Sequence, residues 1–164
     1  MSCETAIRVR DARTEDCDAL LTLMRQLARF EGYEDQFRVT AADLLERGGR
    51  GDFHALVADS GQGLAGMLVY YFQPFSYDLT PWLVIKELYI DARYRGQGLG
   101  SQLMQAAAQR CQAAGGSRMR WDVLTDNQPA RAFYESLGAE PQCQWQGYQI
   151  SGDALLQLAE TGAG

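Results

Sequence analysis

The sequence predicts an α/β fold, in which one domain of 164 residues packs a sheet of mixed strand direction against helices. Short runs that alternate apolar and polar residues are typical of half-buried strands. Longer runs with apolar residues at three- and four-residue spacing are typical of amphipathic helices, and the two kinds of run interleave along the chain. The content of 46% hydrophobic and 22% charged residues is that of a globular protein with its own core.

The first half of the chain predicts one strand, two helices and a hairpin. Apolar residues recur at helical spacing from Leu20 to Phe30. Thr40 and Asp43 have the spacing of a capping box, so a short helix begins there and ends at the glycine pair 48–49. We expect a strand at 7–10, a hairpin of strands at 53–59 and 64–72 around the turn 60–63, and a loop or frayed strand start at 73–82.

The second half predicts three strands and three helices. Pro129 suits the first turn of a helix that runs to Leu137, and Gly138 suits the position just after its end. The expected elements are a strand at 84–90, a helix at 101–114, a strand at 118–124, the helix at 129–137, a last strand at 144–150 and a short closing helix around 155–158.

Composition excludes several classes of function. The net charge of −6 argues against nucleic-acid binding and suits a cationic partner better. No apolar run is long enough for a membrane span and the N-terminus lacks a secretory pattern, so we expect a cytoplasmic protein without a membrane partner. Cys3, Cys17, Cys111 and Cys143 are scattered and His54 is the single histidine, which argues against a metal site and favours reduced, mostly buried thiols.

The stretch from Ile85 to Ser101 carries the strongest functional signal. An apolar strand with one carboxylate, Glu87, runs into Arg-Gly-Gln-Gly-Leu-Gly, and a helix follows. Residues without a Cβ let an anion approach the backbone, and the helix N-terminus adds unpaired N–H groups and partial positive charge. A plain strand-to-helix turn needs fewer glycines than these three. The stretch therefore predicts a phosphate-binding turn.

This turn matches neither of two common phosphate loops. It lacks the Gly-Lys-Ser/Thr of a Walker loop, and Ser101 stands where the dinucleotide fingerprint has its third glycine. A strand, then Arg-x-x-Gly-x-Gly, then a helix resembles the acetyl-CoA-binding motif of the GCN5-related N-acetyltransferases (GNAT), with Arg95, Gly98 and Gly100 as the matching residues.

A second motif, Asn-x-Pro-Ala-x-x-x-Tyr-x-x-x-Gly-Ala, lies at 127–139. Asn127 can cap the helix with its side chain and still offer an amide group, and Tyr134 follows about two turns later on the same face. Taken alone, Phe133 and Tyr134 favour core packing over a functional role. With the phosphate turn, the motif resembles the second cofactor motif of the GNAT superfamily, where the tyrosine protonates the leaving thiolate and the asparagine contacts pantetheine.

Nearly the whole chain, apart from 141–143, resembles the diamine (spermidine/spermine) and thialysine acetyltransferase branch of that superfamily. The resemblance implies a single-domain GNAT fold over 1–164, with a mixed central sheet and helices on both faces, acetyl-CoA as cosubstrate and no metal. It also implies a homodimer, in which Tyr70, Tyr71 and Trp145 lie either at the interface or in the core. The implied cofactor-binding residues are Leu88, Tyr89, Ile90, Arg95, Gly96, Gln97, Gly98, Leu99, Gly100, Ser101, Asn127, Pro129, Ala130 and Tyr134. The implied substrate-binding residues are Phe30, Glu31, Lys86, Glu87, Trp121 and Asp122.

Acetyl transfer to an amine sets chemical requirements that two residues can meet. An amine is protonated at pH 7 and must lose a proton before it attacks a thioester, and Glu87 is our candidate base, acting through water. Tyr134 is the candidate acid for the departing thiolate. A salt bridge or a solvated strand face is the alternative explanation for Glu87.

The amine pocket departs from the branch. The residue before Glu87 is acidic in diamine acetyltransferases, whereas here it is Lys86, the one lysine of the chain. A cation there disfavours a long polycation and could pair with the carboxylate of an amino-acid-like substrate. The acidic residues Glu31, Glu34 and Asp35 remain and could recognise one ammonium group, or could simply be solvated.

We therefore predict an acetyl-CoA-dependent N-acetyltransferase that acts on a primary amine of a small molecule, such as a polyamine, thialysine or an amino-acid-like compound, in a ternary complex. Two alternatives stay open. One is a non-catalytic acyl-CoA-binding regulatory module, which would need neither Glu87 nor Tyr134. The other is a protein N-terminal or lysine acetyltransferase, which needs an open peptide groove; the aromatic loop 73–82 is more typical of a wall that closes a small pocket.

Overall fold

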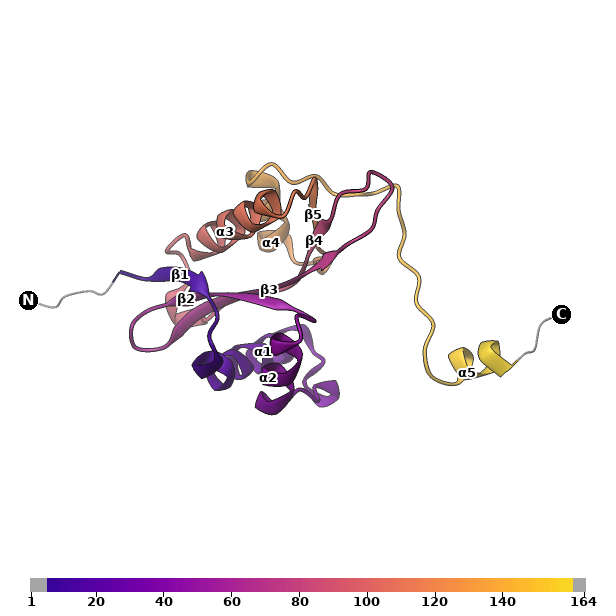
Figure 1. The fold of residues 1–164 in the computed structure, drawn as a ribbon, viewed down its shortest axis with the longest axis horizontal. Helices are drawn as coiled ribbons and strands as arrows, with labels where there is room; N and C mark the ends of the chain where they lie inside the picture. Colours follow the sequence, from indigo (N-terminus) through magenta and orange to yellow (C-terminus); the bar gives the residue numbers. More distant parts are fainter. Residues whose placement is uncertain (1–5, 161–164) are drawn as a thin grey trace, which may run out of the picture. The chain divides into compact units, whose positions relative to one another are not determined.

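A computed structural model of the chain describes residues 6–160. The chain divides into two compact units, Met1–Leu124 and Thr125–Gly164. The first unit holds a five-stranded sheet in the order β1-β2-β3-β4-β5 (Figure 1). The first four strands pair antiparallel, and β5 pairs parallel with β4. The strands are β1 (Arg8–Asp11), β2 (His54–Asp59), β3 (Leu64–Gln73), β4 (Trp82–Ile90) and β5 (Arg118–Arg120).

Helices cover both faces of this sheet. Figure 1 shows α1 and α2 on one side and α3 on the other. The helices of the first unit are α1 (Cys17–Glu31), α2 (Ala41–Gly49) and α3 (Leu99–Ala113), with short 3₁₀ turns η1 (Thr14–Asp16), η2 (Glu34–Gln36) and η3 (Ala92–Tyr94). The second unit holds α4 (Gln128–Ser136) and α5 (Gly152–Glu160). The predicted α/β class with a mixed sheet is confirmed.

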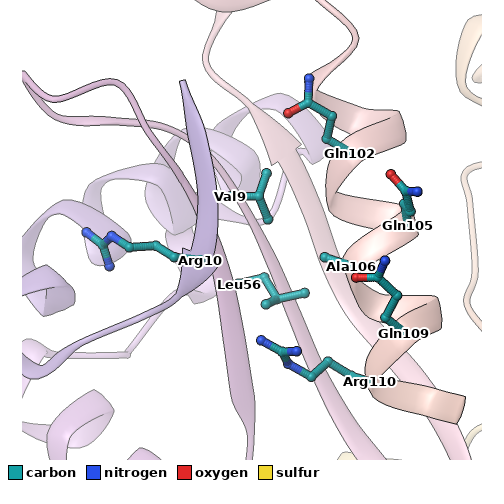
Figure 2. A pocket seen from close by; sticks show the side chains of 8 residues that line it. All are labelled: Val9, Arg10, Leu56, Gln102, Gln105, Ala106, Gln109 and Arg110. Carbon is teal, nitrogen blue, oxygen red and sulfur yellow. The ribbon is translucent and has the colours of Figure 1, made fainter. Parts of the chain in front are cut away.

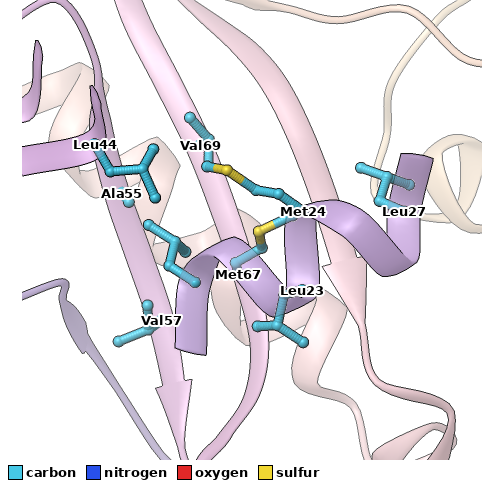
Figure 3. Packing of buried hydrophobic residues seen from close by; sticks show 9 residues of the cluster. Leu23, Met24, Leu27, Leu44, Ala55, Val57, Met67 and Val69 are labelled. Carbon is cyan, nitrogen blue, oxygen red and sulfur yellow. The ribbon is translucent and has the colours of Figure 1, made fainter. Parts of the chain in front are cut away.

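Strand alternation divides the core into two layers. Val57 of β2 and Val69 of β3 pack with Met24 and Leu27 of α1 (Figure 3). The next residue of β2, Ala58, faces the opposite side and packs with Leu99 of α3. Successive side chains of a strand point to opposite faces, so each layer of helices buries one set of them.

Most predicted elements are found with small shifts. The capping box is present, since the Thr40 hydroxyl accepts from the Asp43 amide at 3.2 Å and an Asp43 carboxylate oxygen accepts from the Thr40 amide at 2.8 Å. The hairpin is β2 and β3, and Gly138 has a left-handed φ of 95° just after α4. The closing helix is α5, while α3 begins two residues before the predicted start at Ser101.

Three expectations about strands need correction. Residues 144–150 form no strand: within 6–160 they pair with no other segment, and all are exposed. A strand needs a partner for its backbone groups, and the side-chain pattern alone cannot supply one. The predicted strand 118–124 ends at Arg120. Trp82, which we placed at the end of a loop, begins β4 and is buried.

The expected burial of several side chains is confirmed only in part. Cys111 is buried, Cys17 is half-buried and Cys143 is exposed, whereas Cys3 lies outside the described residues. Tyr70 belongs to the core, so it is not an interface candidate, while Tyr71 and Trp145 are exposed. In residues 6–160, no helix is long and apolar enough to cross a membrane.

Candidate active site

The turn after β4 is held by a buried carboxylate. Asp91 is 6% exposed, and its Oδ1 accepts from both the amide and the Nε of Arg93, at 3.0 and 3.1 Å. The Asp91 amide donates to the Ala65 carbonyl of β3 at 2.9 Å. These bonds hold the pKa of Asp91 below its usual range, with the Arg93 side chain as the main cause. The glycine-rich turn therefore starts from a rigid point.

The turn itself has the geometry of an anion site. Gly96 and Gly98 have φ values of 78° and 75°, and a Cβ at either position would meet nothing within 4 Å. The bare side of each residue thus opens onto free space. Gly98 is the N-cap of the 15-residue helix α3 and offers no side-chain cap, so the first amides of the helix, including those of Gly100 and Ser101, lack intrahelical partners.

The side chains around this turn divide between core and surface. Leu99 is 3% exposed and packs into the core, so its side chain is not available to a cofactor. Arg95 is exposed, donates through Nε to the Ile90 carbonyl at 3.1 Å, and lies 5.7 Å from the centre of the Tyr89 ring. Gln97 is exposed.

β4 has an open edge beside the turn. β5 pairs with β4 only from Trp82 to Val84, so within the described part of the first unit the edge of β4 that faces β5 has no strand partner beyond that point. Leu88, Tyr89 and Ile90, three of the predicted cofactor-binding residues, lie in this stretch. Backbone groups along such an edge can bind an extended ligand.

A β-bulge places Glu87. On β3, Val69 pairs with Glu87 and Tyr70 pairs with Ile85, which leaves Lys86 without a partner. Paired residues share a sheet face, so Glu87 lies on the same face as Val69, against α1. Lys86 is exposed. No residue pattern around Lys86 predicts this bulge.

Glu87 is half-buried and places one carboxylate oxygen in a fully buried position. Its Oε2 is buried and has no partner in the described residues. Burial raises the pKa of Glu87, the Lys86 charge opposes that shift, and the Glu31 charge adds to it. The salt-bridge explanation of Glu87 is not supported, because no ion pair of this carboxylate is found within 6–160. A carboxyl group with a raised pKa suits proton abstraction near neutral pH.

The other predicted substrate residues lie at two places in the first unit. Phe30, 61% exposed, and Glu31 form the end of α1, on the sheet face that carries Glu87. Trp121 and Asp122 directly follow β5. Sequence reasoning missed Tyr33, whose pKa is raised to about 12 by burial and by the charges of Glu87 and Glu31.

The second motif builds a capped helix in the second unit. The Asn127 side-chain oxygen accepts from the Ala130 amide at 3.2 Å, and Pro129 lies in the first turn of α4, both as predicted. Tyr134 lies further along α4, with its ring 5.3 Å from that of Phe133. The cofactor role of these residues stays a prediction.

The β3–β4 loop is ordered by one carboxylate. Asp78 accepts from the hydroxyls of Ser76, Thr80 and Ser117 at 2.6, 2.8 and 2.7 Å. These bonds tie the loop to the residue before β5 and hold the pKa of Asp78 far below its usual range. Phe75 and Tyr77 remain exposed on it.

A groove at the other edge of the sheet, between β1, β2 and α3, is distinct from these residues (Figure 2). Its two cations are already paired, Arg10 with Asp16 and Asp59, and Arg110 with Asp11. Both cations therefore already have carboxylate partners in this structure. It is lined by Val9, Arg10, Leu56, Gln102, Gln105, Ala106, Gln109 and Arg110.

Comparison with known proteins adds an independent finding. The family model of the Acetyltransferase (GNAT) family matches residues 18–139. The thialysine N-epsilon-acetyltransferase of Bos taurus is 30% identical over 171 residues, covering 93% of this chain and 97% of that protein. The spermidine/spermine N(1)-acetyltransferase-like protein 1 of Homo sapiens is 30% identical over 169 residues, 93% of this chain and 24% of that protein. A solved V. cholerae integron cassette protein superposes with a TM-score of 0.79 at 22% identity, covering 95% of this chain and 99% of that chain.

Proposed function

The chain belongs to the GNAT acetyltransferase family and is an N-acetyltransferase, and from this premise we propose that it transfers the acetyl group of acetyl-CoA to a primary amine of a small, amino-acid-like molecule. The observation that carries the proposal is the combination of an open glycine turn at the start of α3 with a carboxylate on the preceding strand, Glu87, whose Oε2 is buried and has no hydrogen-bond partner in residues 6–160.

Acetyl-CoA fits the residues of the turn. Its pyrophosphate would meet the amides at 96–101 and the Arg95 guanidinium, since Gly96 and Gly98 leave free space on their bare sides. The open edge of β4 at Leu88 to Ile90 would hold the pantetheine amide and the acetyl oxygen. Asn127, Pro129 and Ala130 would form the second contact, as the family motif implies.

Two side chains would move the protons. Glu87 takes a proton from the acceptor ammonium, directly or through one water, and frees the nitrogen lone pair. The new N–C bond forms at the thioester carbonyl while the C–S bond breaks. Tyr134 gives its hydroxyl proton to the leaving thiolate, and the second proton that the nitrogen loses passes through water to the Tyr134 phenolate. The products are an amide and CoA thiol, and Glu87 releases its proton to solvent. No covalent acyl-enzyme is required.

Lys86 narrows the substrate class. Its ammonium group is exposed at the bulge next to Glu87, where it would attract a substrate carboxylate and repel a second ammonium group. The Bos taurus relative is named for thialysine, a basic amino acid, which supports the same class. We propose that basic amino acids are better substrates than their decarboxylated diamines.

Paired amines test this proposal. Lysine with 1,5-diaminopentane and ornithine with 1,4-diaminobutane differ only in the carboxylate, and release of CoA thiol measures turnover of each. We expect kcat/KM to be about tenfold higher for the amino acids, and Lys86→Glu to reverse the preference. Arg8→Glu, the same charge change at the exposed edge strand β1, controls for net charge. Equal turnover within each pair would rule out the role of Lys86.

The same assay separates the alternative functions. Tight acetyl-CoA binding without turnover of any amine in a broad panel would favour a regulatory binding module. Turnover confined to peptide amines would favour a protein acetyltransferase.

We also propose that the chain is a homodimer. Trp145 and Tyr148 are 73% and 91% exposed, in the segment 144–150, which pairs with no strand in residues 6–160. An exposed aromatic segment of this kind is typical of an interface. Sedimentation velocity would give the mass of a dimer for the wild type and of a monomer for the double variant Trp145→Ser, Tyr148→Ser.

A further inference from the structure

Two arginines of β5 lie over the indole ring of Trp82. The Cζ atoms of Arg118 and Arg120 are 4.3 and 5.6 Å from the centre of this ring. Trp82 is 5% exposed, whereas both arginines are exposed. Trp82 pairs with Arg118 and Val84 pairs with Arg120, so both guanidinium groups lie on the face of the sheet that carries Trp82.

The same face carries Glu87. On β3, Val69 pairs with Glu87 and Tyr71 pairs with Val84. Val69 and Tyr71 are two residues apart in one strand, so they and their partners share a face. Glu87 and Arg120 therefore lie on one face of the sheet, and both belong to the first compact unit.

Arg120 lies at the point where β4 and β5 separate. It is the last residue of β5, and its pairing with Val84 is the last contact in the ladder between the two strands. Glu87 lies beyond the bulge, two pleats further along β4 and one strand across. Strand dimensions put the backbones of Glu87 and Arg120 about 8 Å apart. A small molecule bound at this point can meet both side chains.

The two arginines differ in what already holds them. Arg118 donates to the Tyr77 hydroxyl at 2.8 Å. Within 6–160, Arg120 has no carboxylate in ion-pair distance, and its recorded contact is the ring of Trp82. A guanidinium group held by an aromatic ring keeps its N–H donors for a carboxylate, which it binds in a bidentate geometry.

The ring beneath Arg120 is itself fixed. Asp78 Oδ1 accepts from Trp82 Nε1 at 3.4 Å, and its Oδ2 accepts from the hydroxyl of Ser117, the residue before β5, at 2.7 Å. One carboxylate thus ties the indole to the start of β5. A group that is positioned before its ligand arrives loses less entropy on binding.

The pyrophosphate of acetyl-CoA is too far away to be the anion that Arg120 binds. Arg120 lies level with Val84, and the glycine turn follows Ile90. Six residues of strand span about 20 Å. The positive charge at Arg120 therefore suits a negative group of the acceptor instead.

We propose that Arg120 is a specificity-determining residue of the acceptor site: its guanidinium group binds the carboxylate of an amino-acid acceptor whose amine meets Glu87. The inference rests on the proposed function and names a second cation besides Lys86. Acceptors without a carboxylate lose the contact with Arg120.

Lysine and lysinamide test this role, because they share the side-chain amine and differ in a carboxylate against a neutral amide. Release of CoA thiol gives kcat/KM for each. We expect Arg120→Gln to lower kcat/KM for lysine about tenfold, through KM, and to leave the value for lysinamide within about twofold. Equal losses for the two amines, or an unchanged value for lysine, would overturn the proposal.

Arg25→Gln is the matched control. Arg25 is also exposed and also lies over an aromatic ring, with its Cζ 6.0 Å from the centre of the Phe37 ring. We expect this variant to keep the wild-type kcat/KM for both amines. If Arg120→Gln fails to fold by circular dichroism, Arg120→Met takes its place, since it keeps an unbranched side chain over the indole.

A second readout does not depend on turnover. Calorimetric titration of the CoA-saturated protein with lysine should give a Kd about tenfold higher in Arg120→Gln than in the wild type. If the wild type acetylates no amine, the proposed function fails, while this titration still decides whether Arg120 binds the carboxylate. Equal Kd values in the two proteins, or no binding of lysine to the wild type, would contradict the role of Arg120.

Discussion

Glu87 combines a stability cost with a chemical use. A carboxylate that is desolvated and lacks a hydrogen bond is expensive to ionise, which is the cause of its raised pKa. Natural chains retain such groups mainly where chemistry needs them. Residue type and position in the strand identified Glu87 from the sequence, but the sheet face on which it lies depends on the bulge, which has no sequence signature.

The cost of Glu87 should appear in the pH dependence of stability. Because its pKa is higher in the folded than in the unfolded state, the folded protein binds the proton more tightly, and this group's contribution to stability falls as pH rises from about 4 through the folded pKa. The glutamine side chain of Glu87→Gln does not titrate, so the variant does not lose this stability as pH rises. We expect the variant to have a Tm a few degrees above the wild type at pH 8 and equal to it at pH 4.

Thermal unfolding at the two pH values checks this expectation. Glu15→Gln, a change at an exposed glutamate in η1, should leave Tm unchanged at both. A lower Tm for Glu87→Gln at pH 8 would mean that the carboxylate has a stabilising partner.

At the scale of elements, the turn between β4 and α3 was the most predictable part of the molecule. Its glycines act through the backbone, and backbone freedom can be read from residue type. The structure shows which of the three glycines use this freedom. Gly96 and Gly98 have left-handed φ values, whereas Gly100 lies in α3. The β4 bulge and the early end of β5 arise from tertiary pairing, which residue types do not encode locally.

Gly98→Ala should weaken acetyl-CoA binding more than its strain explains. A left-handed alanine costs about 1–2 kcal/mol, and its Cβ would enter the free space where we place the pyrophosphate. Gly115→Ala is the matched control, since Gly115 lies just beyond the other end of α3 with a φ of 76° and equally free space.

Calorimetry and thermal unfolding on both variants separate strain from binding. We expect similar losses in Tm for the two, but a roughly tenfold higher Kd for acetyl-CoA only in Gly98→Ala. If the two variants bound acetyl-CoA with equal affinity, the pyrophosphate would not bind at this turn.

For the whole molecule, the sequence predicted the α/β class, the mixed sheet and the family, because hydrophobic periodicity and two motifs are local signals. The prediction of a strand at 144–150 was wrong, because polar residues interleaved with Trp145, Tyr148 and Ile150 are typical of a strand but do not specify a partner for it. The prediction of one domain over 1–164 and the cytoplasmic location stay predictions.

The central claim is acetyl transfer to a small amine with Glu87 and Tyr134 as its proton carriers. The most direct measurement is the amount of N-acetylated basic amino acid formed from acetyl-CoA, determined by mass spectrometry for the wild type, Glu87→Gln and Tyr134→Phe. We expect one acetylated amine for each CoA thiol released by the wild type, and kcat lowered about a hundredfold in each variant with acetyl-CoA still bound. No acetylated product from any amine with the wild type, or full activity in both variants, would contradict the account.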